Sequence, residues 1–159
     1  MSFFHAHIRT TIDIGVMPER VWRILVDFAR YPQWNVTFRF ADGHMRVGER
    51  LDVKVLSGNL RETRVRPVLL RAEESRELRW RGSLLLPGIL DGEHIFELVP
   101  SGEGGTRFNH SEIFSGILVS MLRRELDTNT RRAFESFNRA LKRRAEDDSS
   151  PGESPRESF

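Results

Sequence analysis

Two histidines and a glutamate stand at positions that could support acid–base or ligand-binding chemistry. Residues 108–114 read FNHSEIF, and their alternation places His110 and Glu112 on one face of a predicted strand, between two phenylalanines. His94 lies on the predicted strand before it. If the turn SGEGGT between the strands is centred near Glu103, His94 pairs with Glu112 across them. These three side chains are therefore the candidate polar groups of a functional site.

Several kinds of chemistry fit these groups. A buried glutamate beside a histidine is suited to general acid–base catalysis, and His110 and Glu112 are the catalytic candidates, although neither is assigned. The groups could also orient the polar end of a ligand, or form a satisfied ion pair without a function. Their spacing matches no metal motif, so no metal is predicted. Neither a Gly-rich phosphate loop nor a nucleophile elbow is present, and no cofactor is predicted.

A second unusual feature is the segment SLLLPGILDG at residues 83–92, which has five large aliphatic residues around a Pro-Gly pair. One interpretation is a lid or rim over the mouth of a cavity. Another is a loop that touches a membrane or forms a dimer. A third is that the loop simply packs on a neighbouring helix.

The periodicity of the chain predicts the elements that position these groups. Apolar residues alternate over residues 6–14 and then recur at helical spacing from Pro18 to about Phe28. From about Gly116 to about Arg144 they recur every three to four residues, which predicts one long amphipathic helix. Strand-like alternation fills the region between the helices, at residues 36–40, 51–55, 63–69, 78–82, 94–98 and 108–114.

Three aromatic residues, Phe28, Tyr31 and Trp34, stand where the first helix should give way to the second strand. Pro32 disfavours helical angles at Tyr31, and we expect a short second helical turn that starts at Pro32 and contains Trp34. The three rings either plug one end of the core or contact a ligand. Trp34 is the strongest candidate for ligand contact.

Composition narrows the class of protein. The chain has 159 residues and no cysteine, which is typical of one globular domain without disulfides. No apolar run approaches the ~20 residues of a membrane span, and the N-terminus lacks a signal-peptide pattern, so a cytoplasmic protein is expected. The arginines are scattered along strands and one helix without interleaved aromatic residues, so nucleic-acid binding is not predicted.

The segments that carry a family resemblance are PERVWRILVDFARYPQWN (18–35), LRWRG (78–82), LPGILDGEHIFELVP (86–100), TRFNHSEIFSG (106–116) and FNRALKRRAE (137–146). Over about residues 5–145 the chain resembles the START-like, helix-grip (SRPBCC) superfamily, which includes polyketide cyclases/dehydrases and lipid-transfer domains. These motifs are informative about fold and weakly informative about function.

The resemblance implies an α+β helix-grip domain over residues 1–145. A curved antiparallel sheet of about six to seven strands would wrap around the long C-terminal helix, with two short helices after the first strand and an apolar cavity between sheet and helix. Residues 146–159 are rich in Ser, Pro and Glu and are predicted to be a disordered acidic tail.

The function expected from the resemblance is binding of a small hydrophobic ligand, lipid-like or aromatic, in that cavity. The alternatives are a cyclase or dehydratase that uses His110 and Glu112, and a protein-interaction module that uses residues 84–90. A homodimer is also open, because the 84–90 loop is apolar. The residues predicted to contact the ligand are Trp34, Trp80, His94, Phe96, His110, Glu112, Phe114, Leu122, Leu126 and Phe137.

Overall fold

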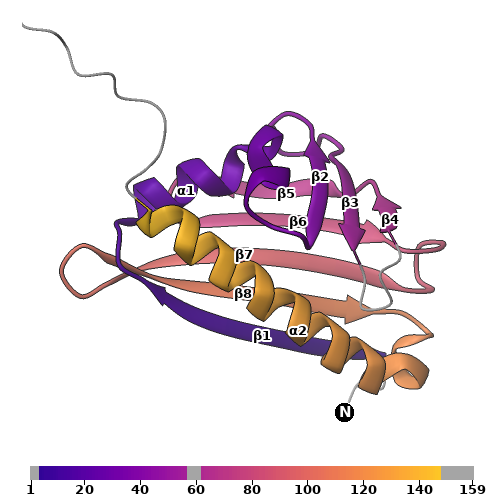
Figure 1. Cartoon of the computed structure of the whole chain (residues 1–159). Helices are drawn as coiled ribbons and strands as arrows, with labels where there is room; N and C mark the ends of the chain where they lie inside the picture. The colour runs from indigo at the N-terminus through magenta and orange to yellow at the C-terminus, as the bar shows by residue number, and fades with distance from the viewer. Residues whose placement is uncertain (1–3, 57–61, 148–159) are drawn as a thin grey trace, which may run out of the picture.

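The computed structural model describes residues 4–56 and 62–147, so most of the predicted tail lies outside the described residues. In these described residues, eight strands form two antiparallel sheets (Figure 1). The larger sheet has the order β1-β8-β7-β6-β5, with β1 at His5–Ile14, β5 at Val68–Glu73, β6 at Glu77–Ser83, β7 at Asp91–Ser101 and β8 at Gly105–Ser115. The smaller sheet has the order β2-β3-β4, with bounds Phe38–Asp42, Asp52–Leu56 and Glu62–Val65.

The second sheet arises because the run predicted as one strand over residues 63–69 is divided. β4 ends at Val65 and pairs with β3, whereas β5 begins at Val68 and pairs with β6. Pro67 lies at the crossing, where a residue without an N–H group interrupts no ladder. The α+β helix-grip class is confirmed, with its strands shared between two sheets.

The register of the two central strands matches the prediction from the turn. β7 and β8 pair His94 with Glu112 and Phe96 with His110. The side chains expected on one face of the sheet are therefore neighbours across the strands.

Three helices complete the part of the fold that the structure describes: α1 (Pro18–Val26), the 3-10 helix η1 (Phe28–Gln33) and α2 (Val119–Glu146). The second helical turn thus starts earlier than expected, at Phe28. Phe28 and Tyr31 are buried in the main core, and the ring of Trp34 packs 5.1 Å from that of Phe137. The aromatic segment closes one end of the core.

α2 runs diagonally across the five-stranded sheet, with α1 and the three-stranded sheet beside it (Figure 1). Its C-terminal end is fastened to the chain around α1: Nε of Arg20 donates to the carbonyl oxygen of Ala145, and the backbone N–H of Gly15 donates to Oε1 of Glu146, both at 2.7 Å. Glu146, which the prediction assigned to the tail, is therefore the last residue of α2 and contacts the domain.

The core has two parts. An aromatic cluster, including Phe38, Trp80, Phe96 and Phe137, fills the space between α1, α2 and both sheets. A smaller aliphatic cluster lies near the start of α2 and is made of Ala6, Ile8, Leu90, Phe114 and Val119, with Leu122 and Leu126 packed against it.

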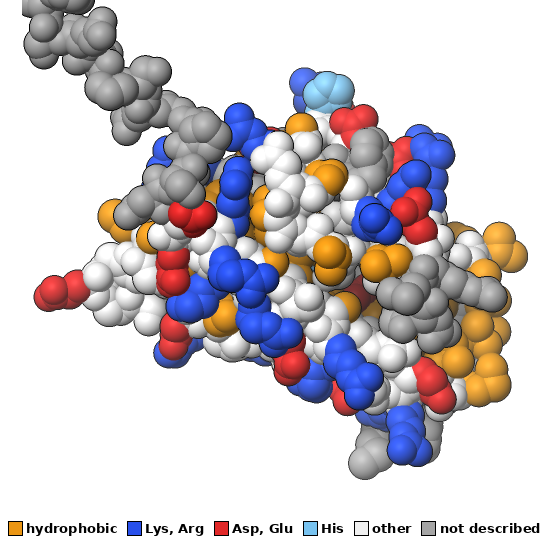
Figure 2. All heavy atoms as spheres, in the orientation of Figure 1, with side chains coloured by type: hydrophobic (Ala, Val, Ile, Leu, Met, Phe, Trp, Pro, Cys, Tyr) orange, Lys and Arg blue, Asp and Glu red, His pale blue; other side chains and the backbone are white. Residues whose placement is uncertain are grey.

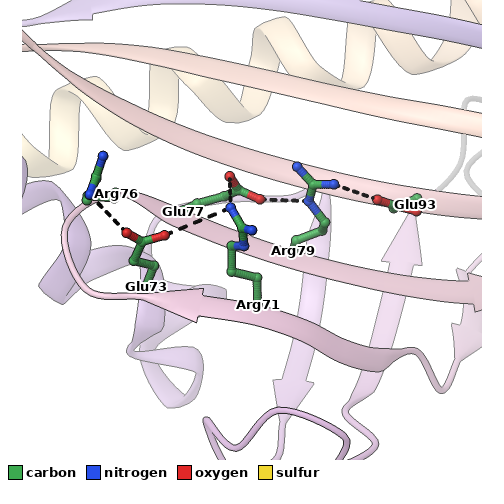
Figure 3. Close-up of polar contacts among 6 residues, drawn as sticks. All are labelled: Arg71, Glu73, Arg76, Glu77, Arg79 and Glu93. Carbon is green, nitrogen blue, oxygen red and sulfur yellow. Dashed lines mark hydrogen bonds and ion pairs between the residues drawn. The ribbon is translucent and has the colours of Figure 1, made fainter.

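The opposite face of the sheet carries ion pairs (Figure 3). Arg79 alternates with the buried residues Leu78 and Trp80 and so points away from the core. It lies 2.7 Å from Glu77 and 2.9 Å from Glu93. The side chains of Glu77, Arg79 and Glu93 are 14%, 33% and 23% exposed, so these pairs are partly buried and cover the face of the sheet that points away from the core. The row of alternating charge is formed by Arg76, Glu73, Arg71, Glu77, Arg79 and Glu93.

Among the described helices, none combines the length and the apolar character that crossing a membrane requires.

Candidate functional site

A cavity of about 470 Å³ opens between α2, the three-stranded sheet and one half of the five-stranded sheet. Small-molecule sites typically have volumes of about 300–1,000 Å³ and apolar walls with a few polar groups. This cavity has that character. Its main lining residues are Phe38, Val53, Val55, Val65, Trp80, Gly92, His94, Glu112, Phe114, Leu122, Leu126, Ala133 and Phe134.

Six of the ten residues predicted to contact a ligand line this cavity: Trp80, His94, Glu112, Phe114, Leu122 and Leu126. The other four, Trp34, Phe96, His110 and Phe137, do not. Phe96 and Phe137 are fully buried in the aromatic cluster, and Trp34 packs on its edge. These four residues lie where the aromatic core fills the space beside the sheet. Their positions therefore do not support the predicted contact with a ligand.

His110 is separated from the cavity by a phenylalanine. The ring of Phe134, on α2, stacks on the His110 imidazole with centroids 3.7 Å apart and an angle of 11° between the planes. Phe134 itself lines the cavity. His110, which is fully buried, therefore does not line the cavity but contacts two residues that do, His94 and Phe134.

The two histidines belong to a chain of hydrogen bonds that begins at Thr10 on β1, the edge strand next to β8. Oγ1 of Thr10 donates to the carbonyl oxygen of His110 at 3.2 Å, and Nδ2 of Asn138 donates to the same hydroxyl oxygen at 2.9 Å. Oδ1 of Asn138 lies 2.8 Å from Nδ1 of His110. Nε2 of His110 lies 2.6 Å from Nε2 of His94.

This chain has a direction, because each group offers a limited number of hydrogens. A threonine hydroxyl has one hydrogen, and Thr10 uses it on a carbonyl, so it can only accept from Asn138. The oxygen of Asn138 then faces His110 and accepts from Nδ1–H. In a neutral imidazole the other nitrogen is a bare acceptor, so Nε2 of His110 accepts from Nε2–H of His94. Nδ1 of His94 is left as an acceptor.

Burial keeps both imidazoles neutral. It lowers the pKa of His94 well below its ordinary value, and the neighbouring His110 lowers it further. Burial lowers the pKa of His110 to about 3, against a small opposing effect of the hydrogen bond with Asn138. The tautomers deduced from the hydrogen bonds are thus those of two uncharged rings.

Glu112 is the polar group on the other side of His94. Its Oε2 lies 3.7 Å from Nδ1 of His94, and its side chain is 17% exposed. Burial raises the pKa of Glu112 to about 8, so the group is a carboxylic acid at neutral pH. A distance of 3.7 Å is too long for a direct hydrogen bond. The cavity wall therefore presents an acid and a neutral base that are adjacent but not bonded.

Gly92 provides the space for this acid. Gly92 is on β7 and pairs with Phe114 of β8. A Cβ atom at position 92 would clash with Oε1 of Glu112. Any larger residue would therefore move the Glu112 side chain.

The loop between β6 and β7 forms one rim of the cavity. Leu84 and Leu90 line the wall. Asp91 holds the loop: Oγ of Ser83 donates to its Oδ1 at 2.5 Å, and the backbone N–H of Gly88 donates to its Oδ2 at 3.0 Å. The hydrogen bond from Ser83 is the largest cause of a lowered pKa of Asp91.

The tip of the same loop is exposed. Leu85 and Leu86 are 63% and 70% exposed. Ile117, whose N–H donates to the carbonyl oxygen of Gly88 in this loop, is also exposed, as is Met121 in the first turn of α2. Figure 2 shows hydrophobic side chains gathered at this right-hand end of the view, whereas Lys and Arg side chains follow the outer face of α2. Leu90 packs against the start of α2, and the carbonyl oxygens of Gly88 and Ile89 accept hydrogen bonds from the N–H groups of Ile117 and Leu118, just before the helix.

Sequence reasoning missed Phe134, Asn138 and Gly92. Asn138 carried a detectable signal, since it is a polar residue between Phe137 and Leu141 on the buried stripe of the helix. Phe134 belongs to the apolar residues of the same helix, but its helical spacing does not reveal that it stacks on His110. Gly92 carried no signal of its own, because its role depends on the path of Glu112.

Comparisons with known proteins agree with this geometry. A family model described as polyketide cyclase / dehydrase and lipid transport matches residues 5–146. Comparison with curated proteins returned no match.

Several solved structures share the fold. A START superfamily protein from Mycobacterium smegmatis is 19% identical with a TM-score of 0.65, covering 88% of this chain and 97% of that one. A protein from Thermus thermophilus is also 19% identical, with a TM-score of 0.72 and coverage of 91% and 100%. The di-domain ARO/CYC StfQ from the steffimycin biosynthetic pathway is 12% identical, with a TM-score of 0.67 and coverage of 91% and 51%. At such identities the similarity establishes the fold alone. Because the family model spans residues 5–146 of 159, the chain belongs to the polyketide cyclase/dehydrase and lipid transport family.

Proposed function

We propose that this protein binds a small hydrophobic molecule, lipid-like or aromatic, in the cavity beneath α2. One observation carries the proposal: a cavity of about 470 Å³ has walls that are mainly apolar and a short polar stretch at His94 and Glu112. Trp80, Phe114 and Leu126 would contact the hydrocarbon part of the ligand. A hydrophobic ligand-binding or cyclase role also fits the family.

A thermal-shift screen tests this proposal. The panel contains fatty acids, flavonoid-like phenols, sterols and quinones. A ligand at about 100 times its Kd adds roughly 2.7 kcal/mol of stability, which raises the Tm of a domain of this size by several degrees. A hit in one chemical class supports a working cavity.

A matched pair of variants locates the binding. Ala133 lines the cavity, whereas Glu135, on the same helix, is exposed. Ala133→Trp should fill the cavity and abolish the shift, while Glu135→Trp should leave it intact. A shift that survives Ala133→Trp, or no shift across the whole panel, would contradict the proposal.

A cyclase or dehydratase is the second candidate function. The observation that favours it is the neutral base Nδ1 of His94 at 3.7 Å from the acid Glu112, both on the cavity wall. His110 would contribute only by orienting His94. With a ligand identified by the screen, Glu112→Gln should preserve affinity and remove turnover if the protein is an enzyme. Product formation by this variant at the wild-type rate would exclude Glu112 as the acid.

A further inference from the structure

We propose that the cavity selects molecules carrying a neutral hydroxyl group, such as a phenol or an alcohol, and that this hydroxyl bridges Glu112 and Nδ1 of His94. The inference rests on the proposed function, because it specifies the polar end of the ligand. It also predicts discrimination against carboxylates, which distinguishes the ligand from a free fatty acid.

The charges of the cavity wall disfavour an anionic ligand. Among the described residues of the wall, the ionisable ones apart from the neutral His94 are Asp91, Glu112 and Glu125, all of them acids. Among the lining residues that the structure describes, none is Lys or Arg. A carboxylate that entered the cavity would lose hydration without meeting a cation from these described residues, which is costly. A neutral polar group avoids this cost.

The hydrogen-bond chain determines which hydrogen-bonding group His94 presents to the cavity. Thr10, Asn138 and His110 each donate within this chain of hydrogen bonds, and Nε2 of His110 is an acceptor. His94 must therefore donate its only N–H to His110. Nδ1 of His94 then reaches the cavity wall as an acceptor without a donor from the described part of this chain. A ligand group at this point must donate a hydrogen. An ether or a ketone cannot do so.

The position of Glu112 places a hydrogen-bond donor near this acceptor. The carboxylic acid offers one O–H donor, at 3.7 Å from the acceptor on His94. A single oxygen atom can lie about 2.8 Å from both atoms, within the ordinary range of hydrogen bonds. A group that accepts and donates at the same atom satisfies both sides, and a hydroxyl is the simplest such group. Gly92 leaves the space that Glu112 needs to adopt this position.

Three probes of equal skeleton test the inference with the full chain: 2-naphthol, 2-methoxynaphthalene and 2-naphthoate. Binding is measured by fluorescence titration at about pH 6, where Glu112 is protonated. We expect 2-naphthol to bind about tenfold more tightly than the methyl ether, which corresponds to about 1.4 kcal/mol for a donor lost from a buried acceptor. We expect 2-naphthoate to bind more weakly than the ether.

Two substitutions of Glu112 provide matched controls. Glu112→Gln keeps an N–H donor in place of the acid O–H and should retain the preference for the hydroxyl. Glu112→Leu removes the donor and should reduce the preference to about twofold or less. His94→Phe, which removes the acceptor, should do the same. Thermal melts of each variant establish that it is folded.

The outcomes separate the two proposals. Equal binding of naphthol and its ether, or tightest binding of naphthoate, would overturn the hydroxyl inference while leaving an apolar cavity in place. A preference that survives both Glu112→Leu and His94→Phe would also overturn it. If none of the three probes binds, the inference falls, and the thermal-shift screen decides the proposed function by itself.

Discussion

The Nε2 atoms of His94 and His110 lie 2.6 Å apart, in a buried site that joins β7 and β8. At this distance one nitrogen must donate and the other must accept. The hydroxyl and amide groups beyond His110 decide which, and the result is a directional link from Thr10, on β1, to the wall of the cavity.

The first prediction concerns the tautomers. His94 should carry its proton on Nε2 and His110 on Nδ1, because only this arrangement satisfies both Asn138 and the bond between the rings. Nitrogen-15 NMR of the imidazole rings at neutral pH distinguishes the two forms. The opposite tautomer at His94 would remove the acceptor from the cavity and contradict the deduced direction.

The second prediction is a loss of stability as the pH rises. The folded protein holds the Glu112 proton up to about pH 8, whereas the unfolded chain releases it near the ordinary value of 4.5, so folding is favoured less as the pH increases through this window. Between about pH 6.5 and pH 8 the free energy of unfolding should fall by roughly 2 kcal/mol.

Glu112→Gln should remove this contribution. The buried histidines change the free energy of unfolding only at lower pH. Because their folded pKa values are depressed, the stability that they contribute as neutral groups is lost as the pH falls below about 6.5. Urea melts of both proteins at several pH values measure the difference, and parallel curves would rule out a titrating Glu112.

The third prediction concerns Asn138. Asn138→Leu keeps the volume but leaves Nδ1–H of His110 without an acceptor, so we expect a loss of roughly 1–3 kcal/mol in the free energy of unfolding. Thr128→Leu, at an exposed position of the same helix, should change it by about 0.5 kcal/mol or less. Chemical denaturation compares them. Equal effects would show that the amide is not needed.

The fourth prediction is a coupling between Gly92 and Glu112. Gly92→Ala should destabilise the protein, because the new methyl group overlaps Oε1 of Glu112. In the background of Glu112→Ala the same change should cost little, since the obstructing carboxyl group is gone. A double-mutant cycle should therefore give an interaction free energy of roughly 1 kcal/mol. Additive effects would mean that the two side chains do not meet.

The fifth prediction tests the exposed loop and the predicted homodimer. Leu85 and Leu86 are largely exposed, so replacing both with Ser should change the Tm by only a few degrees at most. If the apolar cluster at this end mediates self-association, the wild type should show a rising apparent mass with concentration in sedimentation velocity, and the variant should not. A monomeric wild type at high concentration would exclude the dimer.

Much of the architecture followed from local pattern. Alternation and helical period placed α1, α2 and the strands to within a few residues, because burial of one face imposes a period of 2 on strands and 3.6 on helices. The short turn before β8 fixed the pairing of His94 with Glu112. The division between β4 and β5 was not predicted, because the apolar face continues through Pro67 while the hydrogen-bonding partner changes.

The sequence by itself determined which side chains face inwards: His94, His110 and Glu112 lie on the inner face as the alternation predicted. Only the tertiary structure decided which of them reach a cavity. α2 brings Phe134 onto His110 and closes that half of the sheet, while Leu122 and Leu126, nearer its start, stand across an open space. The crossing angle of α2 and the sizes of its side chains determine which half of this space is filled and which stays open. The alternation of residues along the strands does not encode either property.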